Sequence, residues 1–285
     1  MSRTLSSAAR QPPPEKEDDP VTVLVTGFRP FLQKFPKNTS WEIASTLPAL
    51  LPSSPSSPTP IHIHVHHEPV RVTYSHVVSF IPQLLAPANS ITPRPDIILH
   101  IGLAADQSFY TLEKGAQGRG YGAIPDVDGG RFGDERMEEM FPKGMFPQVL
   151  ETSLDVEDVL RRWRRGVGYE NPDEEIGVQD EKTKTPDVRN SPDAGNFMCG
   201  FTYYNSLAHY FSIKKDERPV VFLHVPDLSD SDEKLAVGRE VTIALIKAVV
   251  ESRRKKGVVD GVPRVADGGE DGDVKAGTDV NFAEH

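Results

Sequence analysis

Two short stretches of almost uninterrupted apolar residues constrain the fold of this chain most. Residues 21–26 (VTVLVT) run directly into a glycine, and residues 96–103 (DIILHIGL) also end beside one. Strands that are buried on both faces of a parallel sheet have this continuous apolar character. Between the two stretches, the sequence predicts a helix over residues 38–47, a strand over 61–66 and a second helix over 72–85. This alternation of strands and helices predicts an α/β domain with right-handed crossovers.

The second half of the chain is less regular, but it contains four more recognisable segments. We expect a helix over residues 154–163, a loop that enters a helix over 191–211, a buried strand over 219–225 and a long helix over 231–250. Residues 128–144 look like a surface loop. The long helix is expected to place one set of apolar residues on a single face: Leu235, Val237, Val241, Leu245 and Val249.

The remaining segments are too polar to bury enough apolar surface to offset the entropy of ordering them. The chain has 25 prolines and 22 glycines, many of them near its two ends. We therefore predict a disordered N-terminal tail over residues 1–20 and a disordered C-terminal tail over 253–285. Between the tails we predict a single α/β domain over 21–252, with a charged insertion around 167–190.

Charge and cysteine content argue against several classes of protein. A formal net charge of -10 provides no basic face for the phosphates of a nucleic acid. No stretch reaches about 18 uninterrupted apolar residues, so a membrane span is not expected. The one cysteine, Cys199, cannot form an internal disulfide. Because the N-terminus also lacks the apolar region of a secretory signal, we expect a cytoplasmic protein, and its oligomeric state is left open.

Cys199 is the first candidate for chemistry, because it lies where a glycine-containing turn meets the expected start of a helix. The N–H groups at a helix N-terminus favour the reactive thiolate and can also hold an oxyanion. A buried cysteine that packs as a small apolar residue is the alternative. His224, at the end of the strand over 219–225, is a candidate general base or a buried, hydrogen-bonded histidine. Glu113, in a glycine-rich segment expected to be irregular, could orient the imidazole or be solvated surface.

Two other kinds of site find little support in the sequence. His62, His64, His66 and His67 alternate or adjoin in a strand and raise the question of zinc, but no further ligand is visible nearby. The glycines do not form either of the two common phosphate-binding motifs. We therefore expect no metal site and no nucleotide site.

Blocks of residues around these candidates resemble pyroglutamyl peptidase I, also called pyrrolidone-carboxylate peptidase. The first block is VLVTGFRPF over 23–31, followed by NTSWE over 38–42. A second block combines IGLA over 101–104 with TLEK over 111–114 and is similar to the segment that carries the family's catalytic glutamate. The nucleophile block and the histidine block follow in the same order as in the family: residues 193–204 and residues 222–226.

The resemblance implies a cysteine omega-peptidase that removes an N-terminal pyroglutamyl residue from peptides. It implies Cys199, His224 and Glu113 as the catalytic triad, and a three-layer α/β/α sandwich around a mixed, largely parallel sheet. In that family two phenylalanines form the apolar wall for the lactam ring and an asparagine shapes the same pocket. The matching positions are Phe28, Phe31 and Asn38. Because pyroglutamate has no charged α-amine, an apolar site with a few polar groups suits it. No cofactor is implied.

Some positions depart from the family's pattern. Gly200 stands where an Asn or Asp commonly follows the cysteine, and Ala123 stands where bacterial members carry an Arg. Arg119 or Arg131 is considered as a spatial substitute for that Arg. Two alternatives therefore stay open: an amidase that uses the same triad on another cyclic or acylated amide, and a catalytically weakened relative that only binds its ligand.

Overall fold

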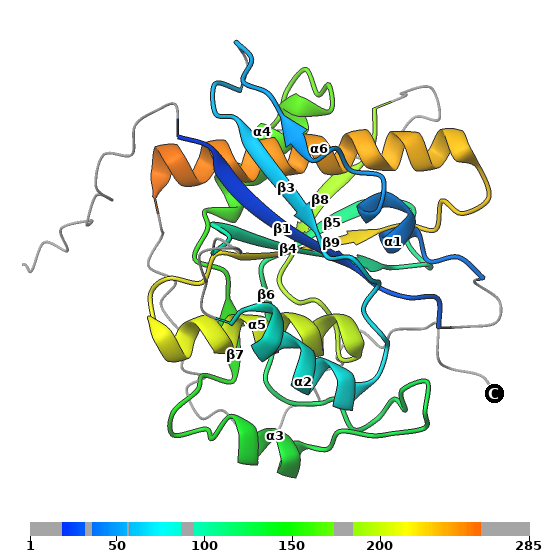
Figure 1. Cartoon of the computed structure of the whole chain (residues 1–285), viewed down its shortest axis with the longest axis vertical. Coiled ribbons are helices and arrows are strands. Elements are labelled where there is room, and N and C mark those ends of the chain that lie inside the picture. The colour runs from blue at the N-terminus through cyan, green and yellow to red at the C-terminus, as the bar shows by residue number, and fades with distance from the viewer. Residues whose placement is uncertain (1–18, 32–35, 56, 87–93, 174–184, 258–285) are drawn as a thin grey trace, which may run out of the picture.

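The computed structural model describes residues 19–31, 36–55, 57–86, 94–173 and 185–257. Seven strands form its central sheet (Figure 1). In spatial order they are β2 (Leu50–Leu51), β3 (Ile61–Val65), β1 (Val21–Gly27), β4 (Ile97–Leu103), β9 (Val220–Val225), β5 (Tyr110–Glu113) and β8 (Val188–Ser191). The central strands β3, β1, β4 and β9 are parallel to one another. β2 runs antiparallel to β3, and β5 runs antiparallel to β9 but parallel to β8. The sheet is therefore mixed and largely parallel, which confirms the expected fold class.

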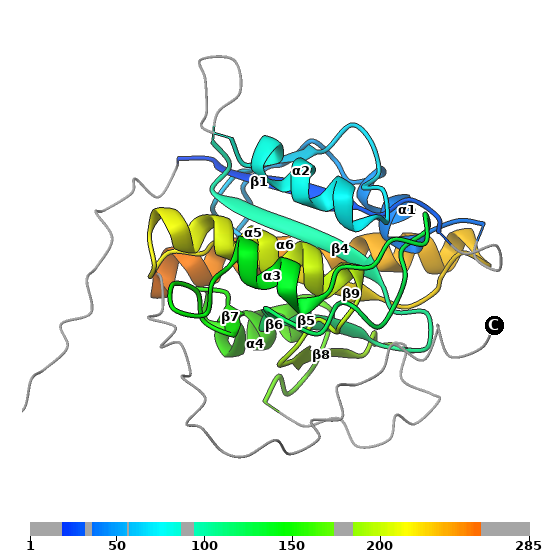
Figure 2. The ribbon, with the colours of Figure 1, turned by 90° about the horizontal axis from the view of Figure 1, so that it is seen from below.

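Helices cover both faces of this sheet (Figures 1 and 2). One face carries α1 (Thr39–Ala44), α4 (Val156–Gly166) and α6 (Asp232–Lys256). The other carries α2 (Tyr74–Leu84) and α5 (Met198–Ile213), with α3 (Asp134–Met140) and the hairpin of β6 (Gly115–Gln117) and β7 (Val149–Glu151) outside them. None of these helices in the described ranges is long and apolar enough to cross a bilayer.

Alternation along the strands divides the core into two parts. In β9, Leu223 and Val225 belong to the core under α6, whereas Phe222 belongs to the core under α5. His224 follows the alternation and lies on the α5 face, where its ring packs 4.9 Å from the ring of Phe222. The sheet thus presents a polar side chain near the carboxyl end of a buried parallel strand, beneath a helix.

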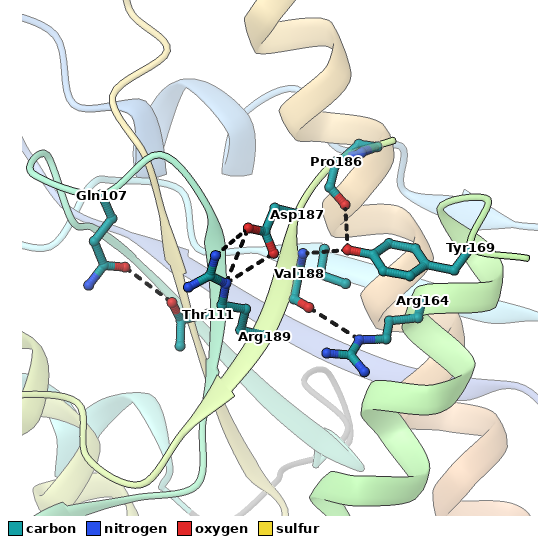
Figure 3. Close-up of polar contacts among 8 residues, drawn as sticks. All are labelled: Gln107, Thr111, Arg164, Tyr169, Pro186, Asp187, Val188 and Arg189. Carbon is teal, nitrogen blue, oxygen red and sulfur yellow. Dashed lines mark hydrogen bonds and ion pairs between the residues drawn. The ribbon is translucent and has the colours of Figure 1, made fainter. Parts of the chain in front are cut away.

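The edge strand β8 is held to α4 by side chains rather than by a further strand (Figure 3). The Tyr169 hydroxyl accepts from the backbone N–H of Val188 at 3.2 Å, and the Arg164 guanidinium donates to the Val188 carbonyl at 3.4 Å. On the other side of the strand, Arg189 pairs with Asp187 at 2.6 Å. These contacts position β8 beside β5, which carries Glu113.

Several expectations need correction. Residues 110–113 form β5 rather than an irregular segment, and residues 134–140 form α3, whose Met137 is buried, rather than a surface loop. Val237 is 48% exposed and does not share the buried face of α6. At Gly238 this helix lies so close to Leu228 and Ile43 that a Cβ there would come within 2.7 Å and 2.9 Å of them, so the buried face passes through residue 238 instead.

The expected tails and insertion fall largely outside the described residues. This applies to residues 1–18, 174–184 and 258–285. Where the structure does describe their edges, regular structure reaches further than expected. The helix α6 continues to Lys256, and the last residues of the segment around 167–190 form part of β8.

Candidate active site

Cys199 is the second residue of α5 and is half-buried. The N-cap residue of this helix, Phe197, provides no side-chain hydrogen bond to the first turn, so the N–H groups there are not satisfied by a capping side chain. Across the sheet, a Cβ on Gly102 would lie only 2.8 Å from Cys199 Sγ. The glycine in β4 therefore makes room for the thiol to rest against the carboxyl end of the parallel strands. The expected position of Cys199 at a helix N-terminus is confirmed.

His224 reaches the thiol from the neighbouring strand. His224 is 8% exposed as a residue and forms a hydrogen bond with Cys199, and its Nδ1 lies 2.7 Å from Glu113 Oε1. Because Nδ1 is used by the carboxylate, Nε2 is the nitrogen left for the thiol. The antiparallel pairing of β5 with β9 sets Glu113 opposite Phe222, which makes Glu113 and His224 diagonal neighbours on one face.

Glu113 is a buried carboxylate, with 2% of its surface exposed. Its Oε1 bonds His224, and its Oε2 has no hydrogen-bond partner within the described part of the chain. The hydroxyl of Tyr203 donates to its backbone carbonyl at 3.2 Å and fixes the end of β5 against α5. Its neighbour Lys114 points away and lies 3.5 Å from Glu151. The solvated-surface alternative for Glu113 is therefore wrong.

The charges around His224 oppose the effect of its burial. Burial lowers the pKa of the imidazole, but the Cys199 thiolate and the Glu113 carboxylate together raise it well above its usual value. An imidazolium beside a thiolate is the arrangement in which the sulfur is already a nucleophile. Cys199, His224 and Glu113 can thus serve as nucleophile, proton carrier and orienting acid.

Phe28, Phe31 and Asn38 lie at the same end of the sheet. The ring of Phe28 is buried 6.4 Å from that of Phe222, two residues before His224. The ring of Phe31 is partly buried and lies 6.3 Å from that of Phe197, two residues before Cys199. Both phenylalanines therefore pack against residues next to the thiol–imidazole pair.

Asn38 acts through its neighbours. Its Oδ1 caps α1 by accepting from the Ser40 N–H at 3.1 Å, and it also accepts from the Ser40 hydroxyl at 2.8 Å. That hydroxyl in turn accepts from the N–H of Phe28 at 2.9 Å. The side-chain amide of Asn38 donates to the Arg29 carbonyl at 3.3 Å. Asn38 is therefore positioned to fix the backbone that carries Phe28.

Two residues near the pair were not identified from the sequence as separate contributors: Phe197 and Asp193. Phe197 had a signal, since it lies within the nucleophile block and precedes the helix, but nothing in its spacing shows the contact with Phe31. Asp193 lies in the same block, and its proximity to Glu113 and His224 depends on a chain reversal that the sequence pattern does not reveal.

Local contacts explain the departure at Gly200 and show what binds Arg119 and Arg131, the two residues considered as substitutes for the arginine missing at Ala123. A Cβ on Gly200 would lie 1.8 Å from the carbonyl oxygen of Gly195, so only glycine fits this packing. Arg119 binds Glu138 and the carbonyl of Phe141, and Arg131 donates to the carbonyls of Gly122 and Ala123. Both arginines hold their own loop, and neither is placed by these contacts beside Cys199.

The four histidines in and directly after β3 do not form a metal centre in the described structure. Within the described ranges, no group of three or more His, Cys, Asp or Glu side chains is arranged to hold a metal ion. His66 instead packs its ring against Phe80 at 5.0 Å, and its Nδ1 lies 2.8 Å from the Glu68 carbonyl.

Comparison with known proteins confirms the resemblance. No family model matches the chain. Human pyroglutamyl-peptidase 1 is 28% identical over 232 residues, which cover 80% of this chain and 88% of that protein. The crystal structure of the pyrrolidone carboxyl peptidase from Thermus thermophilus is 26% identical, with a TM-score of 0.53 over 81% of this chain and 99% of the other. The enzyme from Thermococcus litoralis, 20% identical, shares the fold with a TM-score of 0.59 over 84% and 97%.

Proposed function

We propose that this chain, which is similar to pyroglutamyl peptidase I in sequence and in fold, is a cysteine peptidase that removes N-terminal pyroglutamate from peptides. The observation that carries the proposal is the buried series from Cys199 through His224 to Glu113, with 2.7 Å between imidazole and carboxylate. The relatives reported above are named as peptidases of this specificity. No observation favours the two alternatives, an amidase of other specificity or a binding protein.

The reaction follows from the roles that these groups can take. Cys199 Sγ attacks the carbonyl carbon of the scissile bond that joins pyroglutamate to the next residue, and the N–H groups at the start of α5 stabilise the oxyanion. His224, which holds the thiol proton, gives it to the leaving amine as the C–N bond breaks. Water then hydrolyses the thioester, with His224 accepting its proton, and pyroglutamate leaves while the thiol is restored. Glu113 keeps the imidazole oriented and balances its positive charge.

The apolar wall explains how such an enzyme would select its substrate. Phe28 and Phe31 offer ring surface but no charge to an N-terminal ring. Pyroglutamate is a neutral lactam, whereas proline of similar size carries an ammonium whose burial without a partner costs several kcal/mol. Peptides that begin with pyroglutamate are therefore the proposed substrates.

The proposed location is the cytoplasm. A lone reactive thiolate is readily oxidised, and the reducing cytosol protects it better than an oxidising compartment does. This location also agrees with the cytoplasmic expectation drawn from the sequence.

A substrate panel tests the function. Pyroglutamyl, prolyl and acetyl-alanyl derivatives of 7-amino-4-methylcoumarin are compared at equal concentration with the purified chain. We expect efficient release of the fluorophore from the pyroglutamyl amide alone. Equal cleavage of the prolyl amide would contradict the pocket assignment, faster cleavage of the acetylated amide would favour the other amidase, and no cleavage of any would favour the binding protein.

A further inference from the structure

Asp193 lies in the turn that leads into α5 and is half-buried. One carboxylate oxygen, Oδ1, accepts from the N–H of Gly195 at 3.2 Å, and the carboxylate is also hydrogen bonded to the Gln117 side chain. Gly195 has a φ of 86°, a left-handed conformation that favours glycine. Its carbonyl oxygen is the atom packed against Gly200, the residue after Cys199. The Asp193 carboxylate therefore holds a turn whose far side touches the start of α5.

The same carboxylate also interacts with the charged groups of the site. Burial raises the pKa of Asp193, and the hydrogen bonds from Gly195 and Gln117 act in the opposite direction. The Glu113 carboxylate raises this pKa further, while His224 lowers it. Asp193 thus interacts with a like charge and with the imidazole at once.

Despite its burial, His224 has its pKa raised by Cys199 on α5 and Glu113 on β5, and His224 in turn lowers the pKa of Asp193 in the turn before α5. Asp193 lies two residues after Ser191, which pairs with Glu113 where β8 runs beside β5. Tyr121 also faces Asp193, and burial raises the pKa of its hydroxyl well above the usual value, so it stays neutral over the working range. The interaction between Asp193 and His224 is coulombic, so the carboxylate acts on the imidazole through space.

We propose that Asp193 is a positioning residue for the pyroglutamyl peptidase reaction: its carboxylate fixes the turn before Cys199, and its negative charge helps to keep His224 protonated beside the thiolate. The turn contact and the charge are separable, because an asparagine can still accept from the Gly195 N–H but carries no charge. The proposal rests on the proposed function, since the reaction it serves is the one inferred above.

The test compares Asp193→Asn with the wild-type chain over a range of pH. Two rates are followed: kcat/KM for the pyroglutamyl amide, and alkylation of Cys199 by iodoacetamide, which needs no substrate. Loss of the charge should move the upper inflection of both profiles, where the imidazolium loses its proton, to lower pH by roughly half a unit. Asp193→Glu should keep the inflection near its wild-type position. Glu217→Gln is the matched control, because it removes a partly exposed carboxylate that precedes β9, at the opposite end of the strand from His224, and should leave both profiles unchanged.

The outcomes separate the charge from the structure. An unchanged upper inflection in a folded Asp193→Asn variant would overturn the charge role. Asp193→Ala should lose more kcat than Asp193→Asn, since alanine cannot accept from Gly195, and equal rates for the two variants would overturn the turn role. Should the Asn variant not fold, Asp193→Ser supplies the same comparison. A shifted alkylation profile in a chain that does not cleave the pyroglutamyl amide would support the role of Asp193 and refute the proposed function.

Discussion

At the scale of single residues, the site depends on a carboxylate that is almost completely removed from water. Glu113 has one oxygen bonded to His224 and the other without a partner among the described residues. A buried charge of this kind is costly unless an opposite charge lies beside it. A proton on His224 offsets this cost, and Cys199 and Glu113 together raise the pKa of the imidazole despite its burial. Glu113 and His224 therefore form one electrostatic unit.

Replacing Glu113 with glutamine should slow the enzyme without unfolding it. The amide oxygen can still accept from His224, but the charge is lost, so the pKa of His224 falls. We expect kcat/KM to drop by roughly a hundredfold and its high-pH limb to move to lower pH, with a smaller loss than in His224→Ala. The pH profile of the pyroglutamyl amide assay measures this. A variant as fast as wild type at every pH would show that another group orients the imidazole.

Replacing Phe31 with alanine tests the apolar wall. If the ring of a bound lactam packs against it, the lost contact is worth about 1.5–3 kcal/mol, so kcat/KM should fall by one to two orders of magnitude with a raised KM. The alkylation rate of Cys199 should stay near the wild-type value, because the ring of Phe31 packs against that of Phe197. Unchanged kcat/KM would remove Phe31 from the pocket and leave the other assignments in place.

The residues also show how much of the site the sequence could predict. The position of Cys199 at a helix N-terminus and of His224 at a strand end followed from local patterns. The burial of Glu113 did not, because it depends on pairing with a strand 111 positions away and on Tyr203 above it. The residues alone left its role open between orienting the imidazole and being solvated surface, and the resemblance to a family favoured the first.

At the scale of elements, α5 joins Cys199, the proposed nucleophile, to the rest of the site. Its first turn packs against the left-handed turn at Gly195, and the contact is so close that no side chain fits at Gly200. A larger residue at position 200 would push the Gly195 turn and the start of α5 apart and so shift the helix. The register of Cys199 against His224 is therefore set by Gly200 as well as by the strands.

Replacing Gly200 with alanine should move the start of α5. The added methyl group would meet the Gly195 carbonyl, and overpacking of this kind costs about 1–3 kcal/mol of stability. We expect a lower melting temperature and at least a tenfold loss of kcat/KM. Gly144→Ala is the matched control, because a Cβ there has no atom within 4 Å. Wild-type activity in Gly200→Ala would show that the helix start is not coupled to the site.

The elements that the sequence did not predict are short and depend on distant partners. β5 and β8 have four residues each, and Arg189 and Asn190 in β8 are exposed. These short strands lack the long apolar run that identified β1, β4 and β9. Pairing stabilises them instead: β5 pairs with β9, and β8 pairs with β5. A distant partner also explains why Val237 is exposed although it was predicted to be buried. The contact of α6 with α1 through Gly238 decides which face of α6 is buried.

At the scale of the whole molecule, the mixed sheet places the site at the carboxyl end of its parallel strands. The parallel strands β1, β4 and β9 end there, and β5, which starts at that end and runs antiparallel to β9, sets Glu113 opposite Phe222 and diagonal to His224. The sequence predicted the parallel part, because buried parallel strands are apolar throughout. It could not predict the reversal of β5 and β8.

A chain trimmed to residues 19–257 should behave like the full-length protein. The segments removed are polar or rich in Pro and Gly, whereas the buried core lies within the retained range. We expect the melting temperature and kcat/KM to stay within experimental error. A chain ended at residue 250 is the control, because it loses the buried Glu251 and Ser252 and should be less stable. A lower melting temperature in the 19–257 chain would assign the ends a role in folding, and an oligomeric state different from that of the full-length protein would assign them a role in assembly.

The central claim is that the single thiol performs the peptidase reaction. Its most direct test is a titration of the full-length protein with iodoacetamide, in which intact mass gives the alkylated fraction and the pyroglutamyl amide gives the activity. Because Cys199 is the one cysteine, activity should fall in proportion to alkylation and reach zero at one equivalent. A folded Cys199→Ala variant should be inactive. Peptidase activity that persists in the fully alkylated protein, or in that variant, would contradict the account.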